Sequence, residues 1–202
     1  MSPLRRRGRA MGLAGRRGQS LVEYAATVPV FLLILLGLLE FGFAFSHHLT
    51  MEYASREGAR VGSALANGTD AFPCANVDDQ VIAAVQRVLV AAGSQIDLDQ
   101  INEIRIYQAN NADGNEGSAA NIWRRGNGPT IPGESQPLKF ARASGNWSAC
   151  SRLNGANPDS IGVSVSYTYK YVTPLASLMR LVGAGQLAMN DRTVMALNPT
   201  VP

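Results

Sequence analysis

The sequence has few of the residues from which enzyme active sites and metal centres are built. It contains two histidines, the neighbours His47 and His48, and two cysteines, Cys74 and Cys150. Adjacent residues on a helix point in different directions, so the histidines make a poor pair of metal ligands and packing is the preferred interpretation. The nucleophile elbow, zinc-protease, phosphate-loop and Cys-x-x-Cys motifs do not occur. We therefore expect no catalytic residue, cofactor, metal or small-molecule substrate.

Charged residues are also scarce, at 16% of the 202 residues, whereas 46% are hydrophobic. This hydrophobic content excludes a chain that is disordered throughout, and the length suits one modest domain plus an anchor. The formal net charge of +3 depends on six arginines that precede Gly18, because the remaining chain has 12 basic and 15 acidic residues. Without its first 18 residues the chain would carry a charge of −3. This balance gives no reason to expect a nucleic-acid partner.

The longest apolar run extends from Ala25 to Phe45. As a helix its 21 residues are long enough to cross roughly 30 Å of hydrocarbon. No acidic residue occurs before Glu23, and a Lys/Arg excess stays on the cytoplasmic side of a membrane. The arginines that make up this excess are Arg5, Arg6, Arg7, Arg9, Arg16 and Arg17. We therefore expect one span of the cytoplasmic membrane, with the N-terminus inside and the rest of the chain outside.

Three kinds of processing compete at this segment. A secretory signal is cut after its apolar core, but Ala44-Phe45-Ser46 is a poor cleavage site and the apolar run is longer than usual. A lipoprotein needs a cysteine at the cut, and neither cysteine is near. The third possibility is a cut before the span.

The residues before the span resemble a known leader. Gly18 is followed by Gln-Ser-Leu-Val-Glu-Tyr and then the apolar run, which is similar to the class III leader of type IV-like prepilins. Glu23 and Tyr24 resemble the Glu-Tyr pair of the tight-adherence (Flp, or Tad) branch. Glu-Phe-Gly at residues 40–42 and Ser-Arg-Glu-Gly-Ala-Arg at residues 55–60 resemble TadE-like minor pseudopilins of that system. The resemblance covers about residues 16–66.

This resemblance implies a function and a set of partners. A prepilin peptidase would remove the basic leader, residues 1–18, by cutting between Gly18 and Gln19. Glu23 and Tyr24 would act in assembly with other pilin or pseudopilin subunits and the assembly platform. The product would be a tight-adherence pilus that supports adhesion and surface colonisation. The chain would then reside in the cytoplasmic membrane and, after assembly, in the pilus or at the cell surface.

Two acidic residues interrupt the apolar segment or its edge. An acid in the membrane costs about 2.5–3.5 kcal/mol on insertion scales, so it needs a partner, a proton or a route to the headgroups. The resemblance implies that Glu23 meets the free amine of Gln19, its own or a neighbour's. The alternative is a glutamate that only marks the headgroup boundary. Glu40 could likewise reach the outer boundary, or it could contact another helix.

The helix is expected to continue beyond the span to about Ala66. Residues at steps of three and four form a narrow stripe of small side chains after Phe45. They are Met51, Ala54, Gly58, Val61 and Leu65. Asn67-Gly68-Thr69 then has the chemistry of a turn. Residues 19–66 are thus predicted to form one helix, transmembrane and then amphipathic.

Residues 67–202 are expected to form a small extracytoplasmic α+β domain. Asn76 starts a second helix, with Asp78 and Asp79 favoured by the helix dipole and a buried face of Val77, Val81, Val85, Val88 and Ala92. Alternating residues predict strands at 104–107, 161–171 and 187–197, the last interrupted by Asn190-Asp191. Thr173-Pro174 opens a short helix with Leu175, Leu178, Met179 and Val182 on one side. The prediction is an antiparallel sheet of about three strands with one or two packed helices.

A long insertion separates the first two predicted strands, at residues 109–160. So long a loop is usually functional, disordered or tied down. Cys74 and Cys150 favour a disulfide that ties it down, with free thiols as the alternative. The insertion also holds Trp123 and Trp147. A second hypothesis for the function is therefore a permanently anchored binding or adhesion module that does not enter a filament.

Overall fold

The structure is a computed structural model that describes residues 15–70, 72–110, 113–134, 136–181 and 183–198. Most of the expected leader, residues 1–14, lies outside the described residues, and so does Val182. The described chain contains three α-helices and five strands. Their bounds are α1 Gly15–Leu65, α2 Val77–Leu89, β1 Ile101–Ala109, β2 Glu116–Arg125, β3 Phe140–Gly145, β4 Ser160–Lys170, α3 Leu175–Leu181 and β5 Gln186–Ala196.

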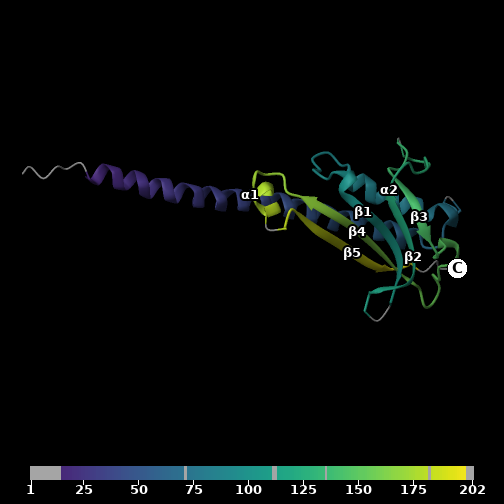
Figure 1. Cartoon of the computed structure of the whole chain (residues 1–202). Helices are drawn as coiled ribbons and strands as arrows, with labels where there is room; N and C mark the ends of the chain where they lie inside the picture. Colours follow the sequence, from purple (N-terminus) through teal and green to yellow (C-terminus); the bar gives the residue numbers. More distant parts are fainter. Residues whose placement is uncertain (1–14, 71, 111–112, 135, 182, 199–202) are drawn as a thin grey trace, which may run out of the picture.

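Helix α1 is continuous, but its two halves have different surroundings (Figure 1). The first half projects from the rest of the molecule as a rod, and Pro29 lies inside it without ending the helix. The second half lies along the domain, where Met51 and Ala54 are fully buried. One helix therefore forms both the exposed apolar rod and part of the domain core.

Two glycines let the second half of α1 approach its neighbours closely. A Cβ on Gly58 would lie 2.6 Å from Cγ2 of Val85 in α2. A Cβ on Gly62 would lie 2.5 Å from Cδ1 of Ile161 in β4. Both distances are well below the usual separation of carbon atoms in contact, about 3.5–4.0 Å. Because Gly58 and Gly62 have no side chain, α1 can pack closely against both α2 and the sheet.

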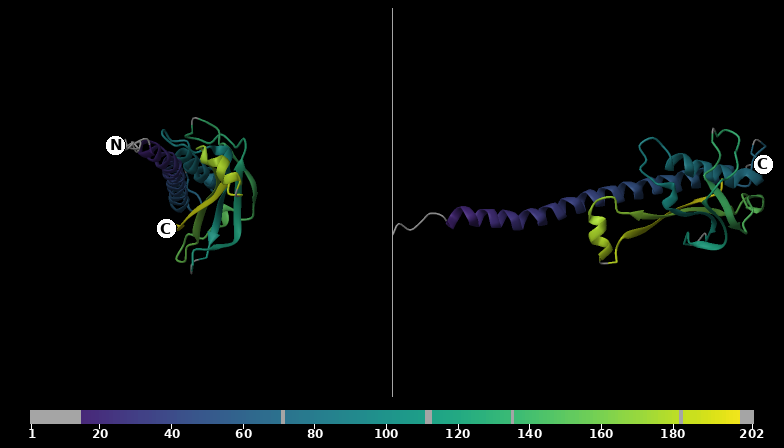
Figure 2. Two further views of the ribbon diagram at one scale, coloured as in Figure 1. Left: turned by 60° about the vertical axis from the view of Figure 1, so that its left-hand side comes forward. Right: turned by 45° about the horizontal axis from the view of Figure 1, so that its top comes forward.

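The strands form one antiparallel sheet in the order β3-β2-β1-β4-β5. Figure 2 shows α1 and α2 on the same side of this sheet. Alternate residues of a strand face the same side, and the odd-numbered residues of β4 face the helices. These residues, Ile161, Val163, Val165, Tyr167 and Tyr169, are fully buried. The tyrosines of β4 are therefore part of a packed sheet face.

The α+β class is as predicted, but the sheet has five strands where the sequence predicted about three. The three predicted strands correspond to β1, β4 and β5, and β5 runs through Asn190 and Asp191 without a break. The additional strands β2 and β3 lie in the segment 109–160 and extend the sheet beside β1. The segment therefore contains two strands of the sheet and is not a single loop.

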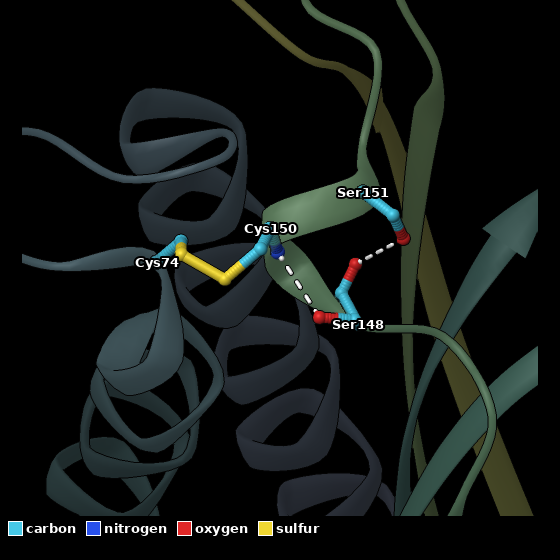
Figure 3. The surroundings of a disulfide bond; sticks show 4 residues. All are labelled: Cys74, Ser148, Cys150 and Ser151. Atoms are coloured by element: carbon cyan, nitrogen blue, oxygen red, sulfur yellow. Dashed lines mark hydrogen bonds between the residues drawn. A yellow bond between two sulfur atoms is a disulfide. The ribbon is translucent and has the colours of Figure 1, made fainter.

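A disulfide joins Cys74, in the 3₁₀ turn before α2, to Cys150, in the 3₁₀ turn after β3 (Figure 3). Their Cα atoms lie 4.9 Å apart across a sequence separation of 76 residues, a normal distance for a disulfide. The hydroxyl of Ser148 accepts a hydrogen bond from the N–H of Cys150 at 3.3 Å. The disulfide ties the later part of the 109–160 segment to the start of α2.

Candidate assembly site

The first half of α1 presents large apolar side chains to its surroundings. The exposed ones are Leu21, Val22, Tyr24, Val30, Phe31, Leu32, Leu33, Ile34, Leu35, Leu38 and Leu39. Five consecutive residues, 31–35, are among them, so the apolar surface extends around the helix. The helix is long enough and apolar enough to cross a membrane. Such a surface is stable in lipid or against other helices, not in water.

The residues predicted for processing and assembly all lie near the start of α1 and are exposed. The helix is continuous through the bond between Gly18 and Gln19. The side-chain amide of Gln19 donates a hydrogen bond to Oε1 of Glu23 at 3.1 Å. The side chain of Tyr24 is 71% exposed. The structure thus places Gln19 and Glu23 side by side, one turn apart on one face.

No packing contact in the described chain explains a glycine at position 18. A Cβ added to Gly18 would meet nothing within 4 Å, and the same is true of Gly37 and Gly42. Glycine inside a helix costs about 0.5–1 kcal/mol relative to alanine. All three positions are therefore open to contacts with other molecules, for which small residues permit close approach.

Glu40 is 3% exposed although it lies in the apolar part of α1. Its Oε1 accepts hydrogen bonds from the hydroxyl of Tyr169 and, at 2.9 Å, from the N–H of Val172. Its Oε2 accepts one from the N–H of Thr173, also at 2.9 Å. The donors lie 129 to 133 residues further along the chain, at the end of β4 and in the loop before α3. We call these four residues the Glu40 clasp, and within one chain they fasten that loop to α1.

Aromatic contacts extend the clasp toward the domain. The ring of His47 is buried and lies edge-on to the rings of Tyr167 and Tyr169, with Nδ1 3.2 Å from the Tyr167 hydroxyl oxygen. Burial lowers the pKa of His47 and so favours the neutral ring. Burial, followed by the hydrogen bond to Glu40, raises the pKa of Tyr169, so its hydroxyl keeps the proton that it donates. His48 is exposed, and the two histidines do not share a site.

The Arg-Glu-Gly-Ala-Arg run of α1 divides between surface and core. Its arginines form ion pairs on the exposed side, Arg56 with Glu52 and Arg60 with Glu57. Surface pairs of this kind contribute little, about 0–1 kcal/mol. Gly58 faces α2, where its lack of a side chain is required for packing. The run is therefore explained by the folding of this chain, in contrast to Gly18.

A buried ion pair beside the disulfide was not apparent from the sequence. Arg152 donates a hydrogen bond to Asp78 at 2.5 Å, with side chains 0% and 7% exposed. Asn121 donates to the other carboxylate oxygen at 2.7 Å, and the guanidinium lies over the Trp147 ring, 4.1 Å from its centroid. The sequence pattern relates Asp78 only to the helix dipole. Its contacts instead connect α2, β2 and the segment after β3.

Several polar groups of this region bind one another, although Nε and Nη1 of Arg152 are buried without a hydrogen-bond partner. A cavity of about 460 Å³ beside the disulfide is lined in part by Asp78 and Arg142. Asp78 is bound as described, and Arg142 donates to Oδ1 of Asn121 at 2.8 Å. Among the described residues, no group of three or more His, Cys, Asp or Glu could hold a metal ion. The network therefore has the character of a structural cross-link.

Comparison with known proteins adds one finding. Residues 18–60 match the family model described as TadE-like protein. Searches of the curated proteins and of the solved structures gave no match. The matched segment begins at Gly18 and contains the whole apolar half of α1 and Glu40, which supports a minor-pilin-like role associated with the Tad pilus. The resemblance to TadE-like proteins inferred from the sequence is confirmed over residues 18–60, where the chain is similar to that family.

Proposed function

We propose that this chain is a minor pilin, or pseudopilin, required for assembly of a tight-adherence (Flp) pilus. A prepilin peptidase cuts it after Gly18, and α1 holds it in the cytoplasmic membrane until it joins other pilin subunits at the assembly platform. The pilus supports adhesion and surface colonisation. The observation that carries this proposal is the TadE-like match over residues 18–60, whose first residue is the glycine of the leader motif.

The proposed topology depends on charge. Six arginines precede Gly18, and no acidic residue occurs on that side of the apolar helix before Glu23. Positive flanks stay in the cytoplasm, so the leader is accessible to a peptidase at the inner face and the disulfide-containing domain is outside. An oxidising exterior is compatible with the Cys74–Cys150 bond.

Cleavage gives Glu23 a chemical role. The new first residue would be Gln19, whose free amine is four residues before Glu23 and about 6 Å from it along the helix axis. Glu23 already accepts a hydrogen bond from the Gln19 side chain, so the same face carries both groups. Negative charge near a helix N-terminus is favourable. If a neighbouring subunit's amine takes this place, the pairing sets the axial register between two subunits.

Assembly then exchanges one apolar environment for another. Lipid covers the exposed side chains of α1 before assembly, and the helices of neighbouring subunits cover them in the filament. Gly37 and Gly42, which have open space around them, allow close approach of those helices. The Glu40 clasp holds the base of the domain against α1, so the domain keeps a defined orientation relative to the packed helices.

Substitution of Glu23 tests this mechanism. In cells that assemble the pilus, Glu23→Ala should leave leader cleavage intact, because the cut bond lies five residues earlier, but piliation should be lost. Glu52→Ala is the matched control, since it removes an acid of the same helix that pairs with Arg56 on the surface. Cleavage is read from the mass of the chain, and piliation from the sheared surface fraction. Normal pili in the Glu23→Ala strain would eliminate Glu23 from the mechanism.

Co-purification distinguishes a pilin from the permanently anchored binding module. A subunit or assembly factor should be recovered with the major pilin after mild solubilisation, and an anchored module should not. Recovery of the chain only in membranes, free of the major pilin, would favour the module.

A further inference from the structure

Helix α3 is apolar but contributes nothing to the core. Five of its seven residues are Leu, Ala or Met, and none of the seven is buried. Leu178 and Leu181 are 46% and 83% exposed, and Val172 in the preceding loop is 70% exposed. A helix of this length is not stable alone in water, and its exposed leucines together with Val172 form a candidate contact surface.

The position of α3 identifies that partner. In Figures 1 and 2 the helix lies at the end of the domain that faces the projecting half of α1. The loop before it is hydrogen-bonded to Glu40 through the N–H groups of Val172 and Thr173. The base of the domain is therefore fixed to a residue of the membrane-crossing helix itself.

The position of Glu40 relative to the membrane boundaries follows from helix geometry. Sixteen residues without charge separate Glu23 from Glu40. At about 1.5 Å per residue the two acids are about 26 Å apart along the axis. The hydrocarbon core is about 30 Å thick, so a membrane with Glu23 at one boundary has Glu40 at the other. The clasp then holds α3 at the level of the headgroups.

The charges of α3 and the apolar surface next to it fit a position at the level of the headgroups. The segment 170–186 contains two cations, Lys170 and Arg180, and no acid. Both line a hollow of about 350 Å³ beside α3. A crevice of about 260 Å³ between α1 and β5 is lined by Phe41, Ala44, Phe45, His48, Leu187 and Met189, mostly apolar side chains. Cations beside apolar side chains are typical of segments that lie in the boundary region of a membrane.

We propose that the α3 segment, residues 170–181 and 183–187, docks into the membrane leaflet nearest the domain. Leu178, Leu181 and Val172 enter among the acyl chains, while Lys170 and Arg180 meet lipid phosphates. This docking goes beyond the proposed pilin function but rests on its membrane anchor. It gives the subunit a second membrane contact, which is released when the subunit leaves the membrane for the filament.

Tryptophan fluorescence in vesicles tests the docking. The full-length chain is reconstituted in vesicles that contain anionic lipid and lipid brominated close to the headgroup, where bromine quenches nearby tryptophan. The native Trp123 and Trp147 are buried in the domain and provide a constant background. Leu178→Trp reports on α3. Leu153→Trp is the matched control, because Leu153 is 63% exposed and adjoins Asn154, which contacts Asn67 at the opposite end of the domain.

We expect loss of fluorescence in the Leu178→Trp variant and none beyond background in the Leu153→Trp variant. Adding Arg180→Glu to Leu178→Trp should reduce the quenching. A third variant, Leu33→Trp in the middle of α1, monitors the anchor with deeply brominated lipid. Quenching of Leu33→Trp without quenching of Leu178→Trp would overturn the docking while leaving the anchor intact. The docking would also be wrong if a second copy of the chain, and not lipid, covered the side chain at position 178 in the Leu178→Trp variant. Absence of quenching in Leu33→Trp would refute the anchor and the docking together.

Discussion

Replacing Glu40 with alanine should release the loop before α3 from α1. The substitution leaves three donors without their acceptor, the Tyr169 hydroxyl and the N–H groups of Val172 and Thr173. A buried donor that loses its partner costs about 1–3 kcal/mol. Water can reach part of this loop, because Val172 is 70% exposed. We therefore use the lower value, about 1 kcal/mol for each of the three donors. The free energy of local opening should then fall by about 3 kcal/mol.

Hydrogen exchange measures this loss where it occurs. A change of about 3 kcal/mol in the opening free energy corresponds to roughly 100-fold faster exchange of the Val172 and Thr173 amides. The amide of Ile106 in β1, in the middle of the sheet, should keep its protection. The measurement requires the detergent-solubilised full-length chain, so that α1 is intact.

Two variants distinguish the loss of the Glu40 hydrogen bonds from the effect of any substitution in α1. Glu40→Gln keeps one acceptor oxygen and should give an intermediate acceleration. Glu52→Ala removes an exposed ion pair, which is worth little, and should leave the loop unchanged. Unchanged exchange at Val172 and Thr173 in the Glu40→Ala variant would refute the clasp.

Three further predictions concern the domain. Arg152→Met leaves Asp78 as an unpaired buried charge and should lower the free energy of unfolding in urea by about 3–5 kcal/mol, whereas a loss below about 1 kcal/mol would contradict the buried pair. Gly58→Val should destabilise the domain by about 1–3 kcal/mol and lower its Tm, because the new side chain meets Val85. Gly42→Ala, where the added Cβ has open space, should leave the Tm unchanged. Equal Tm values for the two variants would disprove the close packing at Gly58. Burial lowers the folded pKa of His47, so its contribution to stability is present above the ordinary value of 6.5 and is lost as the pH falls through the folded pKa. Between about pH 7.5 and about pH 5 the natural chain should therefore lose more stability than His47→Asn, and parallel stability profiles would argue against this role.

Elements with a strong local pattern were predictable from the sequence. The uniform apolar run and the small-residue stripe after it predicted one long helix, and strict alternation from Ile161 onward predicted β4. Strands β2 and β3 carry no such pattern. Of their residues only Asn121, Trp123 and Phe140 are buried, and small or polar residues occupy most other positions. Pairing with β1 therefore determines their conformation, and pairing is not visible in local periodicity.

The candidate site shows the same division between local and distant contacts. The Gly18 to Tyr24 motif is local in sequence, so the resemblance could be recognised from it. The partners of Glu40 are more than 125 residues away, and two of them are backbone N–H groups, which have no side-chain signature. The sequence could therefore show that an acid at this position needs a partner, but not which one. Asp78 and Arg152, 74 residues apart, escaped prediction for the same reason.

The N-terminus of the mature chain is the most direct test of the proposed processing and assembly. The full-length gene product is expressed with a prepilin peptidase, extracted from membranes and analysed by intact-mass and terminal-peptide mass spectrometry, with a peptidase-free strain as control. If a prepilin peptidase cuts after Gly18, the chain begins at Gln19 only when the peptidase is present. A chain that still begins at Met1 in the presence of an active peptidase, or one that begins beyond Phe45, would contradict this processing.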